Sequence, residues 1–319
     1  MKKITLSLIA MVLLAATSVS TLGRTNPRPS ATDLQSSLPD GIGVASVDIS
    51  QLTGSTLWGA LASGDKPVRA IQSLQARMSD IGLKLTDLSQ MAVCLSSPGT
   101  NGLLAAVTGS ISEDALVGKL RADSRVKLTT ESYKNARVYA AAITNKAGTR
   151  TQNLSFAFTA PAIVVLGSSK GVHAAIDAAR GDKPSLAGDS KLQSALAGTG
   201  AGPIRFAIAP TPDLAKQLES SSIPLPDFST VDLVFGSLGV SSGIDLNVTL
   251  HNDTADHATA MAAQLNSLLS MAKGMLGSST NPKNQVILEA VKTVSITSSQ
   301  SDVKITGSLS QDMLSKVFH

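Results

Sequence analysis

Apolar stretches of five to ten residues recur along the chain and are separated by short polar turns. Segments 91–95 and 103–108 predict two strands joined by a Ser, Pro, Gly and Asn turn. Four further segments are separated only by short turns with Asn, Gly or Pro: 126–131, 137–143, 154–159 and 162–166. Parallel neighbours would need longer crossovers, so the pattern predicts antiparallel strands.

Helical periodicity follows several of these strand pairs. The longest helix is expected from Ala258, with an apolar stripe formed by Met261, Leu265, Leu268, Ala272 and then Met275 or Leu276. We interpret this stripe as a core face. Met261, Met271 and Met275 could instead line an adaptable apolar groove, but methionines on such a stripe are more often core residues.

One strand-to-helix junction occurs twice. Residues 108–116 read TGSISEDAL, and residues 306–314 read TGSLSQDML. Ser112 and Ser310 are suited to cap the following helix. Because residues 42–121 and 204–276 also share one order of strands and helices, we predict an α+β fold. We expect two tandem lobes of mainly antiparallel sheet with helices packed on one face, built from repeated strand–strand–helix units.

The N-terminus has the pattern of an export signal. Lys2 and Lys3 precede an uncharged apolar run, residues 4–16, and small residues continue to Gly23. As a helix this run would span about 20 Å, short of a hydrocarbon core of about 30 Å, so cleavage is favoured over a membrane anchor. The expected location is the periplasm or the extracellular space, with no membrane span after cleavage.

The predicted organisation has four parts. A signal peptide occupies residues 1–23, and the proline-containing residues 24–39 predict a flexible linker. The first α+β lobe covers 40–200 and the second covers 201–319. The glycine-rich residues 198–203 mark the boundary, and because they precede a strand and not a helix they do not indicate a phosphate-binding loop.

Composition excludes some functions. Without Lys2 and Lys3 the 27 basic residues fall to 25 against 23 acidic ones, a net charge of +2 with no basic cluster, so nucleic-acid binding is not expected. Aromatic residues are 3% of the chain, which argues against stacking platforms. The single cysteine, Cys94, lies in an apolar run and is expected in the core.

The sequence pattern of a serine hydrolase occurs at residues 167–171. Gly167-Ser168-Ser169-Lys170-Gly171 matches the G-x-S-x-G elbow between a strand and a helix, with Ser169 as the nucleophile. His251, His257 and His319 are available downstream. The flanking strands are expected to be antiparallel and no glycine-rich oxyanion loop occurs, so we favour a structural turn and assign no catalytic residue.

Residues 251–257 contain the residue types of a metal site. His251, Asp253, Asp256 and His257 are ligand types for Zn²⁺ or Ca²⁺. Asp253 followed by Asp256 at the entry to the longest helix is also typical of a capped helix start. We favour the cap and assign no metal or cofactor.

Residues 162–197 carry a resemblance in pattern. A strand, Gly167-Ser168-Ser169, a helix, and then Gly181-Asp182-Lys183-Pro184-Ser185-Leu186 before a second helix resemble exported bacterial proteins of unknown function. Those proteins have tandem antiparallel-sheet-plus-helix lobes behind a signal peptide. The resemblance implies the same architecture and brings no catalytic residues.

These patterns lead to a non-enzymatic binding or structural module of the cell envelope or secreted space. Its partner is expected to be an envelope protein or an apolar small ligand. One alternative is a periplasmic carrier that holds a lipid between a curved sheet and the longest helix. The other is a serine hydrolase using Ser169.

Overall fold

A computed structural model describes most of the 319-residue chain. The described residues are 31–63, 72, 75, 78–79, 84–96, 102–144, 148–149, 151–214, 228–240 and 243–318. The predicted signal peptide and the start of the predicted linker lie outside them. The chain forms two compact units. One comprises residues to Gly54 together with Arg69–Gln193, and the other comprises Ser55–Val68 together with Ser194–His319.

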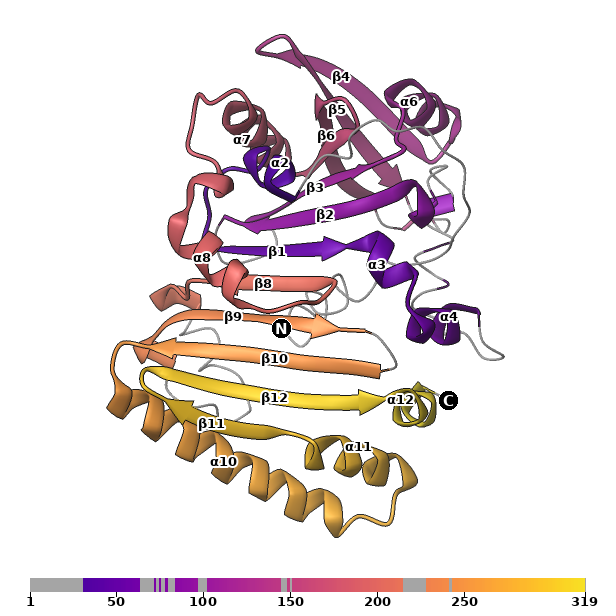
Figure 1. The fold of residues 1–319 in the computed structure, drawn as a ribbon. Coiled ribbons are helices and arrows are strands. Elements are labelled where there is room, and N and C mark those ends of the chain that lie inside the picture. Colours follow the sequence, from indigo (N-terminus) through magenta and orange to yellow (C-terminus); the bar gives the residue numbers. More distant parts are fainter. Residues whose placement is uncertain are drawn as a thin grey trace. The chain divides into compact units, whose positions relative to one another are not determined.

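The first unit contains an antiparallel sheet of seven strands among its described residues (Figure 1). Their order is β1-β2-β3-β7-β6-β5-β4. The bounds are β1 Gly43–Asp48, β2 Leu88–Leu95, β3 Leu103–Gly109, β4 Val126–Tyr133, β5 Ala136–Thr144, β6 Thr151–Ala160 and β7 Ile163–Gly167. Neighbours pair in antiparallel register throughout, including the four successive strands that the short turns predict.

Helices cover both faces of this sheet. Leu116 and Leu120 of α6 (Glu113–Ala122) pack in a buried cluster with Tyr139 and Phe156. The next residue along β6, Ala157, is also fully buried although it points to the opposite face. The helix α7 (Ser169–Ala179) lies against β6 and β7. The α+β class is as predicted, but in this unit the expectation of helices on one face is too narrow.

The predicted linker contains ordered structure. Residues Ala31–Ser36 form α2, and Leu34 and Leu38 are almost completely buried. The Leu186 amide, in a 3-10 turn η3 (Leu186–Gly188), donates to the Leu38 carbonyl. The prediction of a flexible tether is therefore wrong from residue 31 onward. The segment has no long apolar period, but burial of two leucines is sufficient to hold this short helix against the first unit.

Other short elements complete the first unit and the passage to the second. They are α3 (Ile49–Thr53) and the 3-10 turn η1 (Leu85–Asp87). The chain enters the second unit within α8 (Ser190–Gly198), several residues before the expected boundary. The helix α4 (Thr56–Ser63) groups with the second unit, which chain order does not predict.

The second unit has an antiparallel sheet in the order β8-β9-β10-β12-β11 (Figure 1). Its elements are β8 Ile204–Ile208, η4 Phe228–Thr230, β9 Val231–Gly239, β10 Gly243–Asn252, α10 Ala255–Gly277, α11 Pro282–Lys292, β11 Ser295–Ser299, β12 Asp302–Ser310 and α12 Gln311–Phe318. Met261 and Ala262 of α10 pack on Leu250 and Val303 in a buried cluster. On the other face of the same strands Asn247, Lys304 and similar polar residues are exposed.

The same junction recurs four times in the two units. After each of the hairpins β2–β3, β6–β7, β9–β10 and β11–β12 comes a helix whose first turn is capped by a serine or threonine hydroxyl. The caps are Ser112, Ser168, Thr254 and Ser310, each accepting from the amide three residues later. The predicted caps at Ser112 and Ser310 are confirmed, and Ser168 and Thr254 cap their helices in the same way.

Candidate functional site

The hydrolase candidate Ser169 is the first residue of α7 and is exposed. The neighbouring Ser168 is the cap, and its hydroxyl accepts from the Gly171 amide at 3.2 Å. The preceding strand β7 is antiparallel to both of its neighbours. A nucleophile elbow belongs to a strand-to-helix turn of an α/β-hydrolase sheet, so this turn resembles the elbow in sequence and differs in its setting.

The histidine nearest to Ser169 in sequence is His173, which is not one of the three downstream histidines named above. His173 lies one helical turn further on, and its Nε2 is 2.8 Å from Glu131 Oε1. The ring of Tyr133 stacks on its imidazole at a centroid distance of 4.1 Å. These contacts direct His173 toward β4 and away from a role as the base for Ser169.

A polar network holds α7 to the turn between β4 and β5. The carboxylate of Asp177 is almost completely buried and receives Lys134 Nζ at 2.7 Å, Lys183 Nζ at 3.1 Å and the Tyr133 hydroxyl at 3.1 Å. The hydrogen bond from Lys134 lowers the pKa of Asp177 to about 2. The same bond raises the pKa of Lys134, which also contacts Asp182.

The lowered pKa of Asp177 follows from the structural role of this network, which fixes the turn between β4 and β5. Lys134 and Asn135 have positive φ angles of 47° and 64°, so the turn is of the tight kind that joins hairpin strands. Arg180 donates to the Lys134 carbonyl at 2.9 Å. Sequence reasoning missed the cluster because its members are 44 residues apart along the chain at the Tyr133 and Asp177 contact.

Of the four candidate metal ligands at 251–257, three lie in two separate pairs, and Asp256 belongs to neither pair. His251 Nδ1 lies 2.7 Å from Asp302, whereas His257 Nδ1 lies 2.6 Å from Asp253. The hydrogen bond from His257 is the main cause of a lowered pKa for Asp253. Within the described ranges, His, Cys, Asp and Glu side chains form no group of three or more with a metal-holding arrangement.

The helix start at these residues is capped, as the sequence predicts. Thr254 is the cap and accepts from the His257 amide at 3.2 Å. Asp256 lies in the first turn, where a carboxylate is favoured by the helix dipole. Asp253 precedes the cap and pairs with His257. The prediction of a capped helix start at these residues is confirmed.

The remaining candidates have structural roles. Cys94 is buried, and its thiol donates to the Pro39 carbonyl at 3.3 Å. Burial, with a smaller contribution from Asp40, raises the pKa of the Cys94 thiol to about 12. In the glycine-rich segment, the Thr199 hydroxyl donates to Leu196 and its carbonyl accepts from Ser237.

An exposed apolar surface lies on α10. Met261 is 3% exposed, as the core prediction requires, but Met271 is 57% and Met275 is 70% exposed. The prediction that these two methionines lie in the core is therefore wrong. With the partly buried Leu268 they occupy positions i, i+3 and i+7 of one helix, so they lie along one side of it. We call Leu268, Met271 and Met275 the methionine ridge.

The methionine ridge lies in the second half of α10. Fully buried residues of α10 end at Ala262, Leu265 still packs against the sheet cluster, and Asn266 donates to the Ile296 carbonyl of β11. The helix also packs against α11. Ile287 of α11 is 42% exposed and is the third strongly exposed large hydrophobic residue among the described side chains. Figure 1 shows the two helices as an antiparallel hairpin along the β11 edge. Within the described residues, no helix is both long enough and apolar enough to cross a membrane.

Comparisons with known proteins assign no family. No family model matches the chain, and no curated protein matches it. Among solved structures, crystal form IV of TP0453 aligns over 89% of this chain and 95% of its own with 10% sequence identity and a TM-score of 0.49. Similarity at this level shows neither a common family nor a common function.

Proposed function

We propose that the protein is exported and acts as a non-enzymatic binding module of the cell envelope or the secreted space, with the methionine ridge as its binding surface. The observation that carries the proposal is the exposure of Met271 and Met275. Apolar surface costs about 25 cal/mol per Å² when left in water, and clustered exposure is typical of interaction sites. Methionine is also suited to adaptable contact because its side chain is flexible and polarisable.

The polar clusters support a binding role over catalysis because each has a structural task. Ser168 caps α7, and Asp177 holds the β4–β5 turn. His251 and His257 are each engaged by one carboxylate. No further chemistry is needed to explain why these residue types occur at these places.

Carriage of a lipid beneath α10 is less well supported. The space between α10 and the sheet is filled by a buried cluster that includes Met261, Leu250 and Val303. Three partly buried residues, Val248, Ile296 and Ile305, pack against this cluster. We therefore assign binding to the outer side of α10 and not to its sheet-facing side.

Methionine oxidation in intact cells tests the proposal. Hydrogen peroxide converts exposed methionine to its sulfoxide, which peptide mass spectrometry measures. In purified protein Met271 and Met275 are expected to oxidise rapidly and Met261 slowly. In cells, oxidation of Met271 and Met275 is expected to be about tenfold slower relative to purified protein, because a partner covers the ridge.

A reporter on the same helix provides the control. Ser270 is exposed and lies on a different side of α10 from the ridge, because residues one or two positions apart in a helix do not face each other, so Ser270→Met adds a methionine that a partner on the ridge leaves accessible. That methionine is expected to oxidise equally fast in cells and in purified protein. Equal rates for Met271 and Met275 in the two settings refute the proposal.

A further inference from the structure

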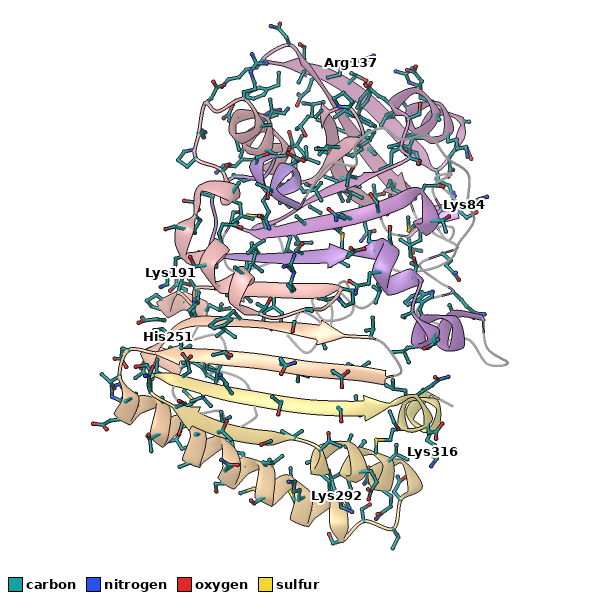
Figure 2. All side chains as sticks on the ribbon, viewed as in Figure 1. Lys84, Arg137, Lys191, His251, Lys292 and Lys316 are labelled. Atoms are coloured by element: carbon teal, nitrogen blue, oxygen red, sulfur yellow. The ribbon has the colours of Figure 1, made fainter. Side chains whose placement is uncertain are left out.

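The strand β4 is an open edge of the sheet in the first unit. It is the last strand in the order, and among the described strands it pairs with β5 alone. Figure 1 shows β4 along the rim of this sheet, and Figure 2 shows Arg137 of β5, which pairs with Ser132 of β4. The eight residues of β4 include no glycine or proline, and their register with β5 is regular. Because edge strands are usually blunted by such breaks, β4 is suited to pair with a further strand.

The hydrogen-bonding pattern determines which residues of β4 face outward. The Thr144 amide of β5 donates at 2.9 Å to the carbonyl of Arg125, the residue before β4. Residues of an antiparallel strand alternate between bonding to a neighbour and facing away from it. The backbone amides and carbonyls of Leu128, Thr130 and Ser132 therefore face away from β5. No described strand lies beyond them, so these groups can bind the backbone of another strand.

The charges of β4 complement each other under a twofold axis. Lys127 and Glu131 point to the same face of the sheet, and both are exposed. At about 3.4 Å per residue they are about 13 Å apart, too far to form an ion pair within one strand. In an antiparallel pair of β4 strands centred on Thr129, Lys127 of each copy lies opposite Glu131 of the other. The same register places Leu128 opposite Thr130, so the outward-facing backbone groups meet.

We infer that β4 is the interface of a homodimer, in which two copies of the chain join through antiparallel β4 strands centred on Thr129. The inference concerns a different surface from the methionine ridge and goes beyond the proposed function. Val126 and Leu128 are only partly buried, although they pack against the core cluster that includes α6. A second copy would cover more of these two side chains, which adds apolar burial to the backbone hydrogen bonds.

Other registers of the same two strands are less favourable. The outward-facing backbone groups meet only when the twofold axis passes through a residue. An axis at Lys127 or at Glu131 places like charges directly opposite each other, which is destabilising. An axis at Leu128 or at Thr130 places Lys127 opposite a residue without negative charge. Among these positions, the axis at Thr129 is therefore the one that pairs both charges of each strand.

The contact of Glu131 with His173 is compatible with this pairing. His173 Nε2 lies 2.8 Å from Oε1 of the carboxylate, and the Glu131 side chain remains 54% exposed. A lysine from the second copy can therefore approach the same carboxylate from solvent. At the end of β4 the Tyr133 hydroxyl donates to Asp177 at 3.1 Å. Because this contact fixes the strand in the single chain, little ordering is required when a second copy binds.

Sedimentation equilibrium of protein isolated from the producing cells tests the inference. Wild-type protein is expected to form a dimer that dissociates on dilution. Lys127→Glu is expected to weaken the dimer about tenfold, because two attractive contacts become repulsive. Glu131→Lys is expected to weaken it for the same reason. A mixture of the two variants is expected to form a heterodimer of about wild-type affinity, because each contact between residues 127 and 131 again joins opposite charges.

Two further variants separate the edge from general effects of charge and fold. Thr130→Pro removes an outward-facing amide that β5 does not use, so it is expected to abolish the dimer while the sheet is retained. Lys304→Glu makes the same change of charge at an exposed residue of β12 and is expected to leave the dimer unchanged. Circular dichroism of each variant confirms that a loss of the dimer is not a loss of fold.

The outcomes distinguish this inference from the proposed function. Wild-type protein that is monomeric at its highest soluble concentration overturns the dimer, and so does a mixture of the two charge variants that does not associate. A dimer that persists in Thr130→Pro and is lost in Met271→Gln with Met275→Gln assigns self-association to the methionine ridge and also overturns it. The proposed function is tested separately, by protection of the ridge from peroxide in cells.

Discussion

The position of α10 depends on one buried amide, Asn252, three residues before the helix. Its side chain is completely buried. Its Nδ2 donates to the Leu250 carbonyl at 3.2 Å and to the Ser301 carbonyl at 3.4 Å, and its Oδ1 accepts from the Thr230 hydroxyl at 3.3 Å. The amide thereby joins β10, the turn before β12 and the start of β9. We predict that Asn252→Ala destabilises the second unit.

The magnitude follows from these contacts. Three buried hydrogen bonds at about 1 kcal/mol each would lower the free energy of unfolding by about 3 kcal/mol when they are lost. Because the bonds to Ser301 and Thr230 are long, we expect a loss closer to about 2 kcal/mol. Asn252→Asp keeps the acceptor for Thr230 but loses both donors and introduces a charge into a buried site. At neutral pH, Asn252→Asp is expected to lower the free energy of unfolding by more than Asn252→Ala does. In acid, the loss caused by Asn252→Asp is expected to become smaller, because the carboxylate is protonated.

Urea unfolding measures this prediction with two probes. Circular dichroism follows the whole chain, and the fluorescence of Trp58, the single tryptophan, follows α4 of the second unit. Asn247→Ala is the matched control, because Asn247 is exposed on the same strand and its replacement should change stability by less than about 0.5 kcal/mol. A loss for Asn252→Ala no larger than that of the control refutes the assigned role.

Three further predictions concern the first unit. Because Lys134 holds the pKa of Asp177 at about 2, below the ordinary 3.8, the stability from this carboxylate is present above pH 3.8 and is lost as pH falls toward 2. Asp177→Asn should therefore lower the urea midpoint of unfolding at neutral pH. It should also reduce the fall of that midpoint between pH 4 and pH 2, and a fall as large as that of the wild-type protein contradicts the assignment. Cys94, with a pKa raised to about 12, should not react with a thiol reagent at pH 8 until urea unfolds the chain, and rapid stoichiometric labelling of the folded protein contradicts its burial. A fluorophosphonate probe should leave the protein unlabelled, and labelling that disappears in Ser169→Ala would restore the hydrolase alternative.

Local chemistry made much of the fold predictable. The four antiparallel strands between β4 and β7 follow from turns too short for any crossover. The caps at Ser112 and Ser310 follow from a hydroxyl placed three residues before a free amide. Each such feature depends on residues within one turn of each other, so the sequence contains the whole interaction.

Matching residues of the repeated junction do not always have the same structural role. A side chain at Gly109 would collide with the backbone of Asp87, so glycine is required there by close approach. The matching Gly307 has only ordinary contacts around the same position. The repeat therefore predicts the junction and its cap correctly, while the packing against it differs between the copies.

The sequence by itself determined the antiparallel order of the strands from β4 to β7 and the capped junctions, because these depend on neighbours along the chain. Only the tertiary structure decided that Leu34 and Leu38 dock α2, that Asp177 meets Lys134, and that Met275 is exposed. The methionines illustrate the reason. Met261 and Met275 both fit one helical stripe in the sequence, yet one packs on the sheet and the other lies beyond it. Periodicity describes the direction in which a side chain points from its helix, whereas burial depends on whether another element is present in that direction.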